Sequence, residues 1–290
     1  MTDEAAAKTI SSLTVLGLGV MGRPIAQTLS RAGFRVSGWN RSKLPAHLLE
    51  GISLRAALTD AALDDAQILM LKDSAAVDDV LGHLAPTLRA GQIVVDMGSS
   101  EPWRSEAHAR LLARHGIGWV DAPVSGGPEG AEAGSLAIMA GGTMSDFERV
   151  RPLLEALGDS VVRVGKAGAG HTAKLSNQVI VGVLIEAIAE ALALAERAGL
   201  DPDLTREAMR GGSADTRPLH AHGRRMIARD YEARAHVTTM LKDLRTASEL
   251  ARRLDLELPC TERVVALAVQ LVQRGEGGLD IAALHRLRTD

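Results

Sequence analysis

The sequence predicts an α/β protein in which an N-terminal doubly wound sheet is followed by an all-α C-terminal domain. Short β-rich runs alternate with helical patterns over residues 13–165, which is typical of a parallel sheet covered by helices on both faces. After the glycine cluster that runs from Gly165 to Gly170, strand signals vanish and nearly every segment has helical periodicity. We therefore predict two domains, residues 1–165 and residues 166–290.

The candidate strands are short runs of β-branched and other apolar residues. They are Leu13–Leu16, Arg35–Trp39, Ile68–Leu71, Ile93–Asp96, Gly118–Asp121, Ala137–Ala140 and Val161–Val164. Helical patterns cover residues 56–63 and 77–88. In a sheet of this kind ligands bind at the carboxyl ends of the strands. This rule points to Leu71–Ser74, Asp96–Ser100 and Asp121–Gly127 as parts of the site.

The C-terminal domain is expected to consist of helices only. The pattern predicts a long helix over residues 171–198, ended by Gly199, and shorter helices over residues 203–210, 216–229, 237–254 and 261–274. The long helix is apolar around much of its circumference, so we expect it to pack against the sheet domain and another subunit. Glu186 and Glu190 interrupt its apolar tract, which favours a buried helix over a membrane span.

Composition is that of an ordinary globular chain of 290 residues, with 46% hydrophobic and 24% charged residues. The net charge of −3 gives no electrostatic basis for binding nucleic acid or a membrane surface. A lone cysteine, Cys260, cannot form an internal disulfide, and we interpret it as a small buried hydrophobe rather than a nucleophile. We see no secretory leader and expect a cytoplasmic protein. The alanine-rich segment Ala5–Ala7 is expected to be disordered.

The motif Gly17-Leu-Gly-Val-Met-Gly22 follows the first apolar run and precedes a helical pattern that has Pro24 in its first turn. Glycines at such a turn let backbone N–H groups approach a pyrophosphate, and the helix N-terminus favours negative charge. We interpret the motif as a Rossmann-type dinucleotide site; a flexible glycine-rich loop is the alternative. Its expected cofactor-binding residues are Gly17, Gly19, Val20, Met21 and Gly22.

The identity of the dinucleotide is indicated at the end of the next strand. An NAD-binding domain places an acidic residue about twenty residues past the glycines to hold the ribose 2′-OH. Here the chain reads Asn40-Arg41-Ser42-Lys43, with no carboxylate to repel a 2′-phosphate and with two positive charges and a hydroxyl to attract it. We therefore predict that residues 1–165 form an NADP-binding domain, with NADP(H) as the preferred and NAD(H) as the alternative cofactor.

The candidate for proton transfer is Lys174, which lies in the first turns of the long helix. Spacings of three and four place Asn177 and Gln178 on the same helix face. A lysine desolvated between two domains could exchange a proton with an alcohol or carbonyl oxygen, although spacing alone favours an exposed helix lysine. His171 has no acidic partner at helical spacing, so we interpret it as a hinge or surface histidine.

Other polar residues lie at expected strand ends. Ser125, Gly126 and Gly127 offer a hydroxyl and consecutive N–H groups to a carboxylate, or form a tight structural turn. Ser99 and Ser100 could contact a nicotinamide amide or cap the next helix. By itself, Lys242-Asp243 reads as a solvated ion pair.

Taken together, four motifs give the chain a resemblance to the β-hydroxyacid dehydrogenases from Leu13 to about Leu284. The motifs are Gly-Leu-Gly-Val-Met-Gly, Asp-Ala-Pro-Val-Ser-Gly-Gly-Pro-Glu-Gly-Ala, Gly-x-Gly-x-x-x-Lys-x-x-Asn and the late Lys-Asp. The resemblance implies that Lys174 is the general acid or base, with Asn177 and Gln178 beside it. It also implies that Ser125, Gly126 and Gly127 bind the substrate carboxylate. Leu71 and Ser99 then border the cofactor, and Lys242 contacts substrate and cofactor.

The same resemblance implies a Rossmann domain followed by a helical substrate and oligomerisation domain, and hence a homodimer or homotetramer. No metal is implied. The expected function is an NADP(H)-preferring oxidoreductase that interconverts a short β-hydroxy acid and its semialdehyde, of the 3-hydroxyisobutyrate dehydrogenase or 2-hydroxy-3-oxopropionate reductase type. An imine reductase and a non-catalytic NADP-binding module are the alternatives. The imine reductases usually lack a lysine at the position of Lys174.

The chain departs from the family pattern at a few positions. Many members have asparagine four residues after the lysine, whereas here Asn177 lies at three and Gln178 at four, as in the tartronate semialdehyde reductase branch. Lys72 replaces the usual proline after the third strand, and Gly98 replaces a serine or threonine. The long helical extension of the 6-phosphogluconate branch is absent from the sequence, so a small unphosphorylated carboxylate is the expected substrate.

Overall fold

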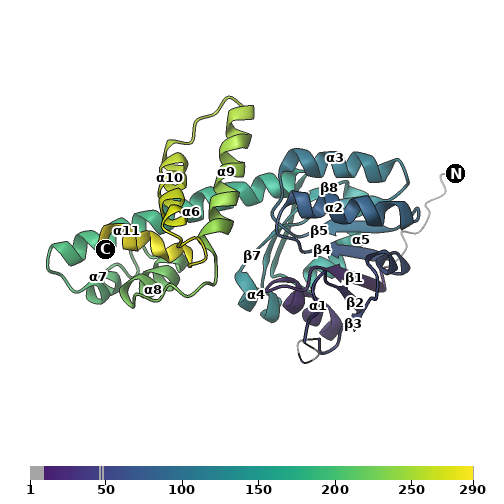
Figure 1. Ribbon diagram of the computed structural model, residues 1–290, viewed down its shortest axis with the longest axis horizontal. Coiled ribbons are helices and arrows are strands. Elements are labelled where there is room, and N and C mark those ends of the chain that lie inside the picture. The colour runs from purple at the N-terminus through teal and green to yellow at the C-terminus, as the bar shows by residue number, and fades with distance from the viewer. Residues whose placement is uncertain (1–9, 46, 48, 290) are drawn as a thin grey trace. The chain divides into compact units, whose positions relative to one another are not determined.

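The computed structural model describes residues 10–45, 47 and 49–289, and the segment Ala5–Ala7 lies outside them. The chain divides into two compact units, Met1–Lys174 and Leu175–Asp290 (Figure 1). The division falls within a helix, beyond the predicted boundary at residue 165. The reason is that the first turn of this helix is held against the sheet by hydrogen bonds to Asp121.

The first unit is built on one mixed sheet. Its strands are β1 (Ser12–Leu16), β2 (Arg35–Trp39), β3 (Ser53–Leu54), β4 (Ala66–Leu69), β5 (Ile93–Asp96), β6 (Gly118–Asp121), β7 (Val124–Ser125), β8 (Ala137–Gly142) and β9 (Ser160–Gly165). Their order is β3-β2-β1-β4-β5-β6-β8-β7, with β9 also paired to β8. Each predicted strand is present, although the third begins and ends earlier than expected, at Ala66 and Leu69. The two-residue strands β3 and β7 were not predicted.

The sheet is mainly parallel, as predicted, and the exception is strand β8. Strand β8 runs antiparallel to both β6 and β7. Neighbouring strands in the series β3-β2-β1-β4-β5-β6 are parallel, and so is the pair β8–β9. After β6 the chain continues through Pro123 into β7, and the Pro123 carbonyl accepts a hydrogen bond from Met139 of β8 at 3.1 Å. The short helix α4 (Gly127–Ala133) then returns the chain directly, which gives an antiparallel partner, because a parallel crossover needs a longer connection.

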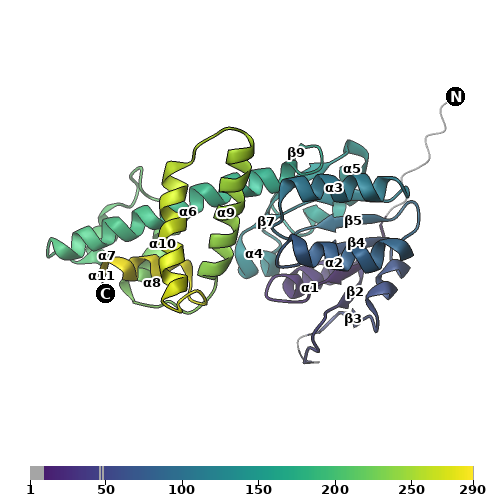
Figure 2. The ribbon, with the colours of Figure 1, turned by 45° about the horizontal axis from the view of Figure 1, so that its top comes forward.

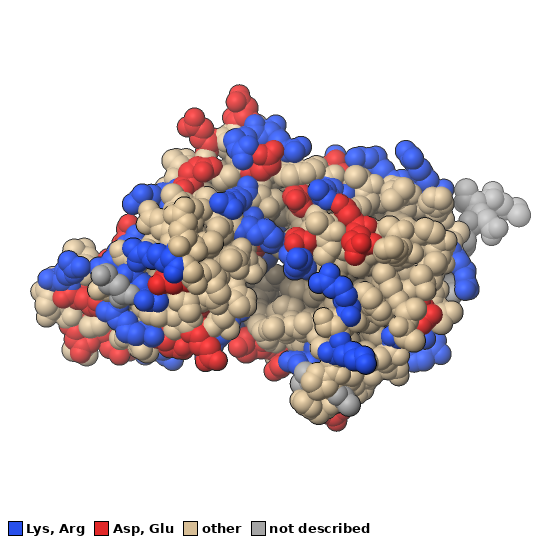
Figure 3. Space-filling view, in the orientation of Figure 1, with Lys and Arg blue, Asp and Glu red and all other residues tan. Residues whose placement is uncertain are grey.

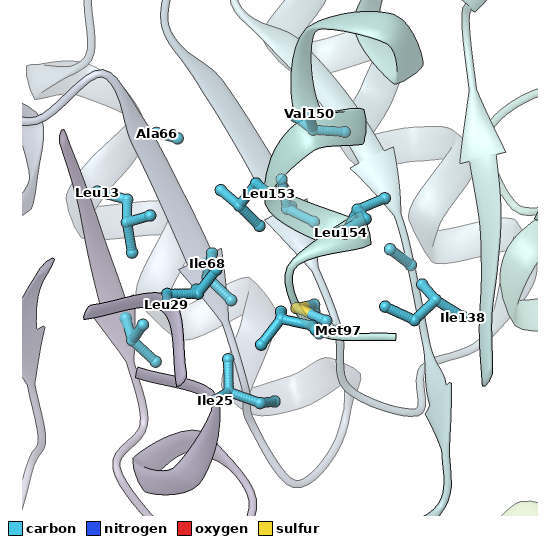
Figure 4. Close-up of a cluster of buried hydrophobic side chains, with 14 of the residues drawn as sticks. Leu13, Ile25, Leu29, Ala66, Ile68, Met97, Ile138, Val150, Leu153 and Leu154 are labelled. Atoms are coloured by element: carbon cyan, nitrogen blue, oxygen red, sulfur yellow. The ribbon is translucent and has the colours of Figure 1, made fainter. Parts of the chain in front are cut away.

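Helices cover both faces of this sheet, as the doubly wound pattern predicts (Figure 2). On one face lie α1 (Gly22–Arg31), α4 and α5 (Met144–Glu155); on the other lie the 3₁₀ helix Leu58–Leu63, α2 (Ser74–Leu84), the 3₁₀ turn Ala85–Thr87 and α3 (Pro102–Ala113). Figure 4 shows the first core, where Leu13 and Ile68 of the sheet meet Ile25 and Leu29 of α1 and Leu153 of α5. The core is aliphatic, in keeping with an aromatic content of 2%.

The second unit is helical. Its elements are α6 (Ala169–Arg197, which begins in the first unit), α7 (Pro202–Ala208), the π-helical turn Leu219–Gly223, α8 (Arg224–Ile227), α9 (Val237–Arg253), α10 (Pro259–Gln273), the 3₁₀ turn Ile281–His285 and α11 (Arg286–Thr289). Figure 1 shows α9 and α10 side by side. The predicted helix over 216–229 is present over residues 217–227, with a π-helical turn at Leu219–Gly223 in its middle, and the elements after residue 280 were not predicted.

Two features of this unit bear on the sequence predictions. By length and composition α6 could cross a membrane, and 44% of its most apolar window is buried within the structure. Its Glu186, only 6% exposed, is paired with Arg288 of α11. Cys260, predicted to be buried, is exposed, because it is the second residue of α10 and precedes Thr261, the first buried residue of that helix.

Candidate active site

The glycine turn between β1 and α1 is tightly built at two of its glycines and open at the third. Gly17 has φ of +99°, and a β-carbon on it would lie 2.4 Å from the Met70 carbonyl oxygen and 3.0 Å from a methyl group of Leu71. A β-carbon on Gly19, in contrast, would meet no atom within 4 Å. The open space at Gly19 is where a pyrophosphate would approach the backbone, so the turn fits the predicted dinucleotide site.

The loop after β2 is tied to this turn by Asn40. The Asn40 side-chain oxygen accepts a hydrogen bond from the Leu18 N–H at 3.0 Å, and its amide group donates to the Ser42 carbonyl at 2.9 Å. Asn40 therefore holds the glycine turn and the Arg41 loop in one arrangement.

A pocket of about 280 Å³ opens at this loop. It is lined by Trp39, Asn40, Arg41, Ser42, Lys43, Leu44, Leu54, Arg55 and Ala56, and none of these carries a carboxylate. Arg41 and Lys43 are exposed, whereas Arg55 is half-buried and pairs with Asp64 at 2.7 Å. Arg55 was not predicted as a site residue, because this side chain reaches the pocket through β3, which pairs with β2 over only two residues.

At the end of β5 the chain is packed tightly around Asp96. The Asp96 carboxylate accepts hydrogen bonds from the Gly98 N–H and the Ser100 hydroxyl, both at 3.0 Å. A β-carbon on Gly98 would lie 2.8 Å from the Leu71 carbonyl oxygen, which explains the glycine at this position. Ser100 is buried, whereas Ser99 is partly exposed.

The predicted carboxylate-binding residues lie at the β7–α4 junction. Ser125 is the last residue of β7, so it lies at a strand end as predicted, and it pairs with Ala137 of β8. Gly126 and Gly127 have φ of +138° and +71°, which only glycine adopts without strain. A β-carbon on Gly126 would also lie 3.0 Å from Leu136, so these glycines are needed for the turn as well as being available to a ligand.

Two buried aspartates, Asp96 and Asp121, lie at the ends of β5 and β6. Both contact the first turn of α6. Asp121 accepts hydrogen bonds from the backbone N–H groups of Gly168 at 2.7 Å and His171 at 3.0 Å. The His171 Nε2 lies 3.2 Å from Asp96 Oδ2, and both side chains are fully buried. The interpretation of His171 as a hinge or surface histidine is wrong: its acidic partner lies 75 residues away in the sequence, beyond any helical spacing.

The pKa values of Asp96 and Asp121 are shifted in opposite directions. Burial alone would raise the pKa of Asp96, but the hydrogen bond and positive charge of His171 outweigh it and hold that pKa below its usual value. Burial dominates at Asp121 and raises its pKa, despite the charge of His171 and the two backbone hydrogen bonds. This pair of environments was missed by the sequence analysis because both contacts are long-range.

Lys174 lies in the second turn of α6, directly after this anchored first turn. It is half-buried, which differs from the alternative of an exposed helix lysine. The carboxyl ends of β5 and β6 thus lie at the start of the helix that carries the predicted acid or base. Within the described ranges 10–45, 47 and 49–289, no cluster of His, Cys, Asp or Glu is arranged to hold a metal ion.

In the helical unit, Gln178 and Lys242 share one carboxylate. The Gln178 side-chain amide donates to Asp243 Oδ2 at 2.7 Å, and Lys242 Nζ lies 2.9 Å from Asp243 Oδ1. Asn177 donates to the Gln178 side-chain oxygen at 3.1 Å. The reading of Lys242-Asp243 as a solvated pair is wrong, because Asp243 is only 2% exposed. Its burial follows from the face of α9 on which it lies, which contains Met240 and Leu244 and packs into the core of this unit.

Two family models together match nearly all of the chain. The family model described as the NAD binding domain of 6-phosphogluconate dehydrogenase matches residues 12–165. A second model, described as the NAD-binding region of NADP-dependent 3-hydroxyisobutyrate dehydrogenase, matches residues 168–288.

Individual proteins are similar over nearly the whole chain. A 2-hydroxy-3-oxopropionate reductase of Escherichia coli K12 is 38% identical over 278 residues, covering 94% of this chain and 95% of the relative. A 2-(hydroxymethyl)glutarate dehydrogenase of Eubacterium barkeri is 32% identical, covering 90% and 87%. The crystal structure of a 3-hydroxyisobutyrate dehydrogenase from Salmonella typhimurium has a TM-score of 0.87 and 29% identity, covering 95% of this chain and 99% of that one. The chain therefore belongs to the β-hydroxyacid dehydrogenase family and is an NAD(P)-dependent oxidoreductase acting on the hydroxyl group of β-hydroxy acids.

Proposed function

We propose that this enzyme prefers NADP(H) and interconverts a short β-hydroxy acid and its semialdehyde, with 2-hydroxy-3-oxopropionate (tartronate semialdehyde) as the substrate of first choice. The observation that carries the proposal is the position of Lys174, half-buried in the second turn of α6 next to the anchored end of the sheet. A primary ammonium held there can donate a proton to an alkoxide, or its neutral form can accept one from an alcohol.

The cofactor site is assigned to the glycine turn and the pocket after β2. Gly17, Gly19 and Gly22 with the start of α1 would hold the pyrophosphate. Arg41, Ser42 and Lys43 would hold the 2′-phosphate, with Arg55 as a third positive charge in the same pocket. The absence of a carboxylate among the lining residues supports NADP(H) over NAD(H).

In the reductive direction, a nicotinamide bound at this site would supply hydride to the aldehyde carbon. Lys174 gives its proton to the aldehyde oxygen, so that the product is a primary alcohol, and it is reprotonated from solvent. Backbone N–H groups at Ser125–Gly127 would bind and orient the substrate carboxylate. Lys242 and Gln178, both held by Asp243, would supply further polar contacts to the substrate.

Two observations support the choice of substrate. The relative at 38% identity is named as a 2-hydroxy-3-oxopropionate reductase. The Lys174-Leu-Ser-Asn177-Gln178 sequence also has the form that resembles the tartronate semialdehyde branch.

Initial-rate assays test the proposal directly. Oxidation of NADPH, with NADH in parallel, is followed against tartronate semialdehyde, methylmalonate semialdehyde, succinic semialdehyde, glyoxylate and a cyclic imine. We expect the highest kcat/KM with tartronate semialdehyde and NADPH. Preferential turnover of methylmalonate semialdehyde would move the enzyme to the 3-hydroxyisobutyrate type. Turnover of the imine alone, or NADPH binding without turnover, would favour the two alternatives stated above.

We also propose that the enzyme is a cytoplasmic homodimer or homotetramer that binds neither nucleic acid nor membranes. Apolar side chains on α6 support self-association, since Ile180 is 66% and Leu194 is 73% exposed. Figure 3 shows both signs of charge on the viewed face, and the net charge of −3 gives no electrostatic basis for binding a polyanion. Light scattering coupled to size-exclusion chromatography measures the oligomeric state, and a monomer would contradict the first part of this proposal.

A further inference from the structure

The first turn of α6 lies on a strand-end clamp, which we define as Asp96, Asp121 and His171. Asp96 and Asp121 are register partners at the last positions of the parallel strands β5 and β6. Both have 0% exposure, and the His171 side chain is equally buried. Placing two carboxylates at adjacent buried positions is costly unless each has hydrogen-bonding partners. Both find them, and the partners include the beginning of α6.

Asp121 acts as an N-terminal cap that is supplied by another element. The first N–H groups of a helix have no partner within the helix. A residue of the same segment usually caps them, but here the Asp121 carboxylate accepts from Gly168 and from His171, the third residue of α6. The cap therefore fixes the helix to the end of β6 and not merely to its own preceding loop.

Glycines make this docking close. A β-carbon on Gly170 would lie 2.4 Å from the Met139 carbonyl oxygen and 2.5 Å from that of Asp121. A β-carbon on Gly141, on the neighbouring strand β8, would lie 2.7 Å from the Gly170 nitrogen. The backbone of the first turn of α6 is therefore in direct contact with the backbone of β6 and β8. The glycine cluster that the sequence marks as a domain boundary is, at this point, an anchored contact.

The His171 side chain adds a second attachment, to β5. Its Nε2 lies 3.2 Å from Asp96 Oδ2, and the same carboxylate holds the Gly98 N–H and the Ser100 hydroxyl. One buried carboxylate therefore joins the loop that carries Ser99 to the helix that carries Lys174. Neither Asp96 nor His171 is exposed enough to contact a substrate.

We propose that the strand-end clamp positions Lys174 for proton transfer, by fixing the helix turn before it to the strand ends. Lys174 follows His171 by three residues, or just under one helical turn, so a shift of His171 moves the lysine directly. Proton transfer depends steeply on placement, and a displacement of about 1 Å can lower a rate about a hundredfold. The inference rests on the proposed role of Lys174.

The first test uses His171→Ala and His171→Gln. In glutamine the side-chain nitrogen can take the place of Nε2 and donate to Asp96. We expect His171→Ala to lower kcat with the preferred semialdehyde by about ten- to a hundredfold, with little change in the Kd for NADPH. His171→Gln is expected to recover most of that loss. The matched control is His108→Ala, which removes another largely buried histidine of the same unit. His108 lies in α3, where its Nε2 is 2.6 Å from Asp78 Oδ1 of α2. It should lower the Tm while leaving kcat unchanged.

The second test needs neither cofactor nor turnover. Amide hydrogen exchange of the peptide covering residues 166–174 is compared in the wild type and in Asp121→Asn, whose amide can accept from only one of the two N–H groups. We expect exchange in this peptide to rise at least about tenfold in the variant, with peptides of α3 unchanged.

The outcomes separate the clamp from the proposed function. Wild-type kcat in His171→Ala, an equal loss of kcat in His108→Ala, failure of His171→Gln to restore it, or unchanged exchange in Asp121→Asn would each overturn the positioning role. A wild-type enzyme that reduces no compound of the panel, while Asp121→Asn still exchanges faster, would instead refute the proposed function and leave the clamp as a structural anchor only.

Discussion

Gly22 lies so close to Gly17 that a β-carbon on Gly22 would fall 1.8 Å from the Gly17 carbonyl oxygen. Gly17 is itself constrained by its positive φ and by the Met70 carbonyl. These two glycines are therefore required by the turn, whatever it binds. Gly19 differs from both, because a side chain there would meet only open space.

This difference predicts that Gly19→Ala and Gly22→Ala fail in different ways. Gly19→Ala should fold with a nearly unchanged Tm but weaken NADPH binding by at least about tenfold, because the added methyl group occupies the approach of the pyrophosphate. Gly22→Ala should lower the Tm or prevent folding. Thermal unfolding and a fluorescence titration with NADPH measure both quantities. Undiminished NADPH binding by Gly19→Ala would show that the turn does not hold the pyrophosphate.

Lys174→Ala should remove the proton donor and leave cofactor binding intact. We expect kcat to fall by at least about a hundredfold, with the Kd for NADPH within about twofold of the wild-type value. Lys166→Ala is the matched control, because Lys166 lies in the same glycine-rich segment with its side chain 86% exposed. Steady-state kinetics and an NADPH titration suffice. The role of Lys174 is wrong if the two variants have equal kcat.

Arg41→Ala should reduce the preference for NADP(H). Losing one charged hydrogen bond to a phosphate corresponds to about 1.5–3 kcal/mol, or roughly ten- to a hundredfold in affinity. We therefore expect KM for NADPH to rise by about that factor, with little change for NADH. Arg35→Ala, at the opposite end of β2, is the control. Equal effects on both cofactors would mean that Arg41 does not contact a 2′-phosphate.

The part of the fold that depends on local pattern could be predicted from the sequence. The β1–glycine–α1 unit was predictable because the hydrophobic period changes from strand to helix across one turn. Strand β7 was not, because its two residues are defined only by pairing with Ile138 and Ala137 of β8. Seven predicted strands against nine observed reflects this dependence on distant partners.

The candidate site divides in the same way. Lys174 and the glycine motif could be nominated from the sequence because each lies in a recognisable run of neighbouring residues. The clamp was missed, because Asp121 and His171 are separated by 50 residues and Asp96 and His171 by 75. Arg55 was missed for a related reason: a two-residue strand delivers it to the pocket. Contacts of this kind follow from strand order, which a single sequence does not specify.

Asp280 is a buried carboxylate of the helical unit that is held by several hydrogen bonds and an ion pair. Its side chain is 0% exposed, and Oδ2 lies 2.7 Å from Arg225 Nη1. It also accepts hydrogen bonds from the N–H groups of Ala235 at 2.9 Å and Ala282 at 3.0 Å. Burial would raise the pKa of Asp280, but His222, these N–H groups and Arg225 outweigh it and hold the pKa well below its usual value.

Asp280→Asn should therefore destabilise the helical unit strongly at neutral pH, by about 3–5 kcal/mol, because Arg225 keeps a buried charge without its partner. The folded-state pKa of Asp280 is depressed, so its contribution is complete above the unfolded-state pKa of about 3.9 and is lost as the pH falls below that value. The difference in unfolding free energy between wild type and Asp280→Asn should accordingly shrink between about pH 5 and pH 3. Urea unfolding followed by circular dichroism measures it, with Asp203→Asn, a 62% exposed aspartate, as the control. A difference that grew on acidification would mean that the carboxylate is not the stabilising form.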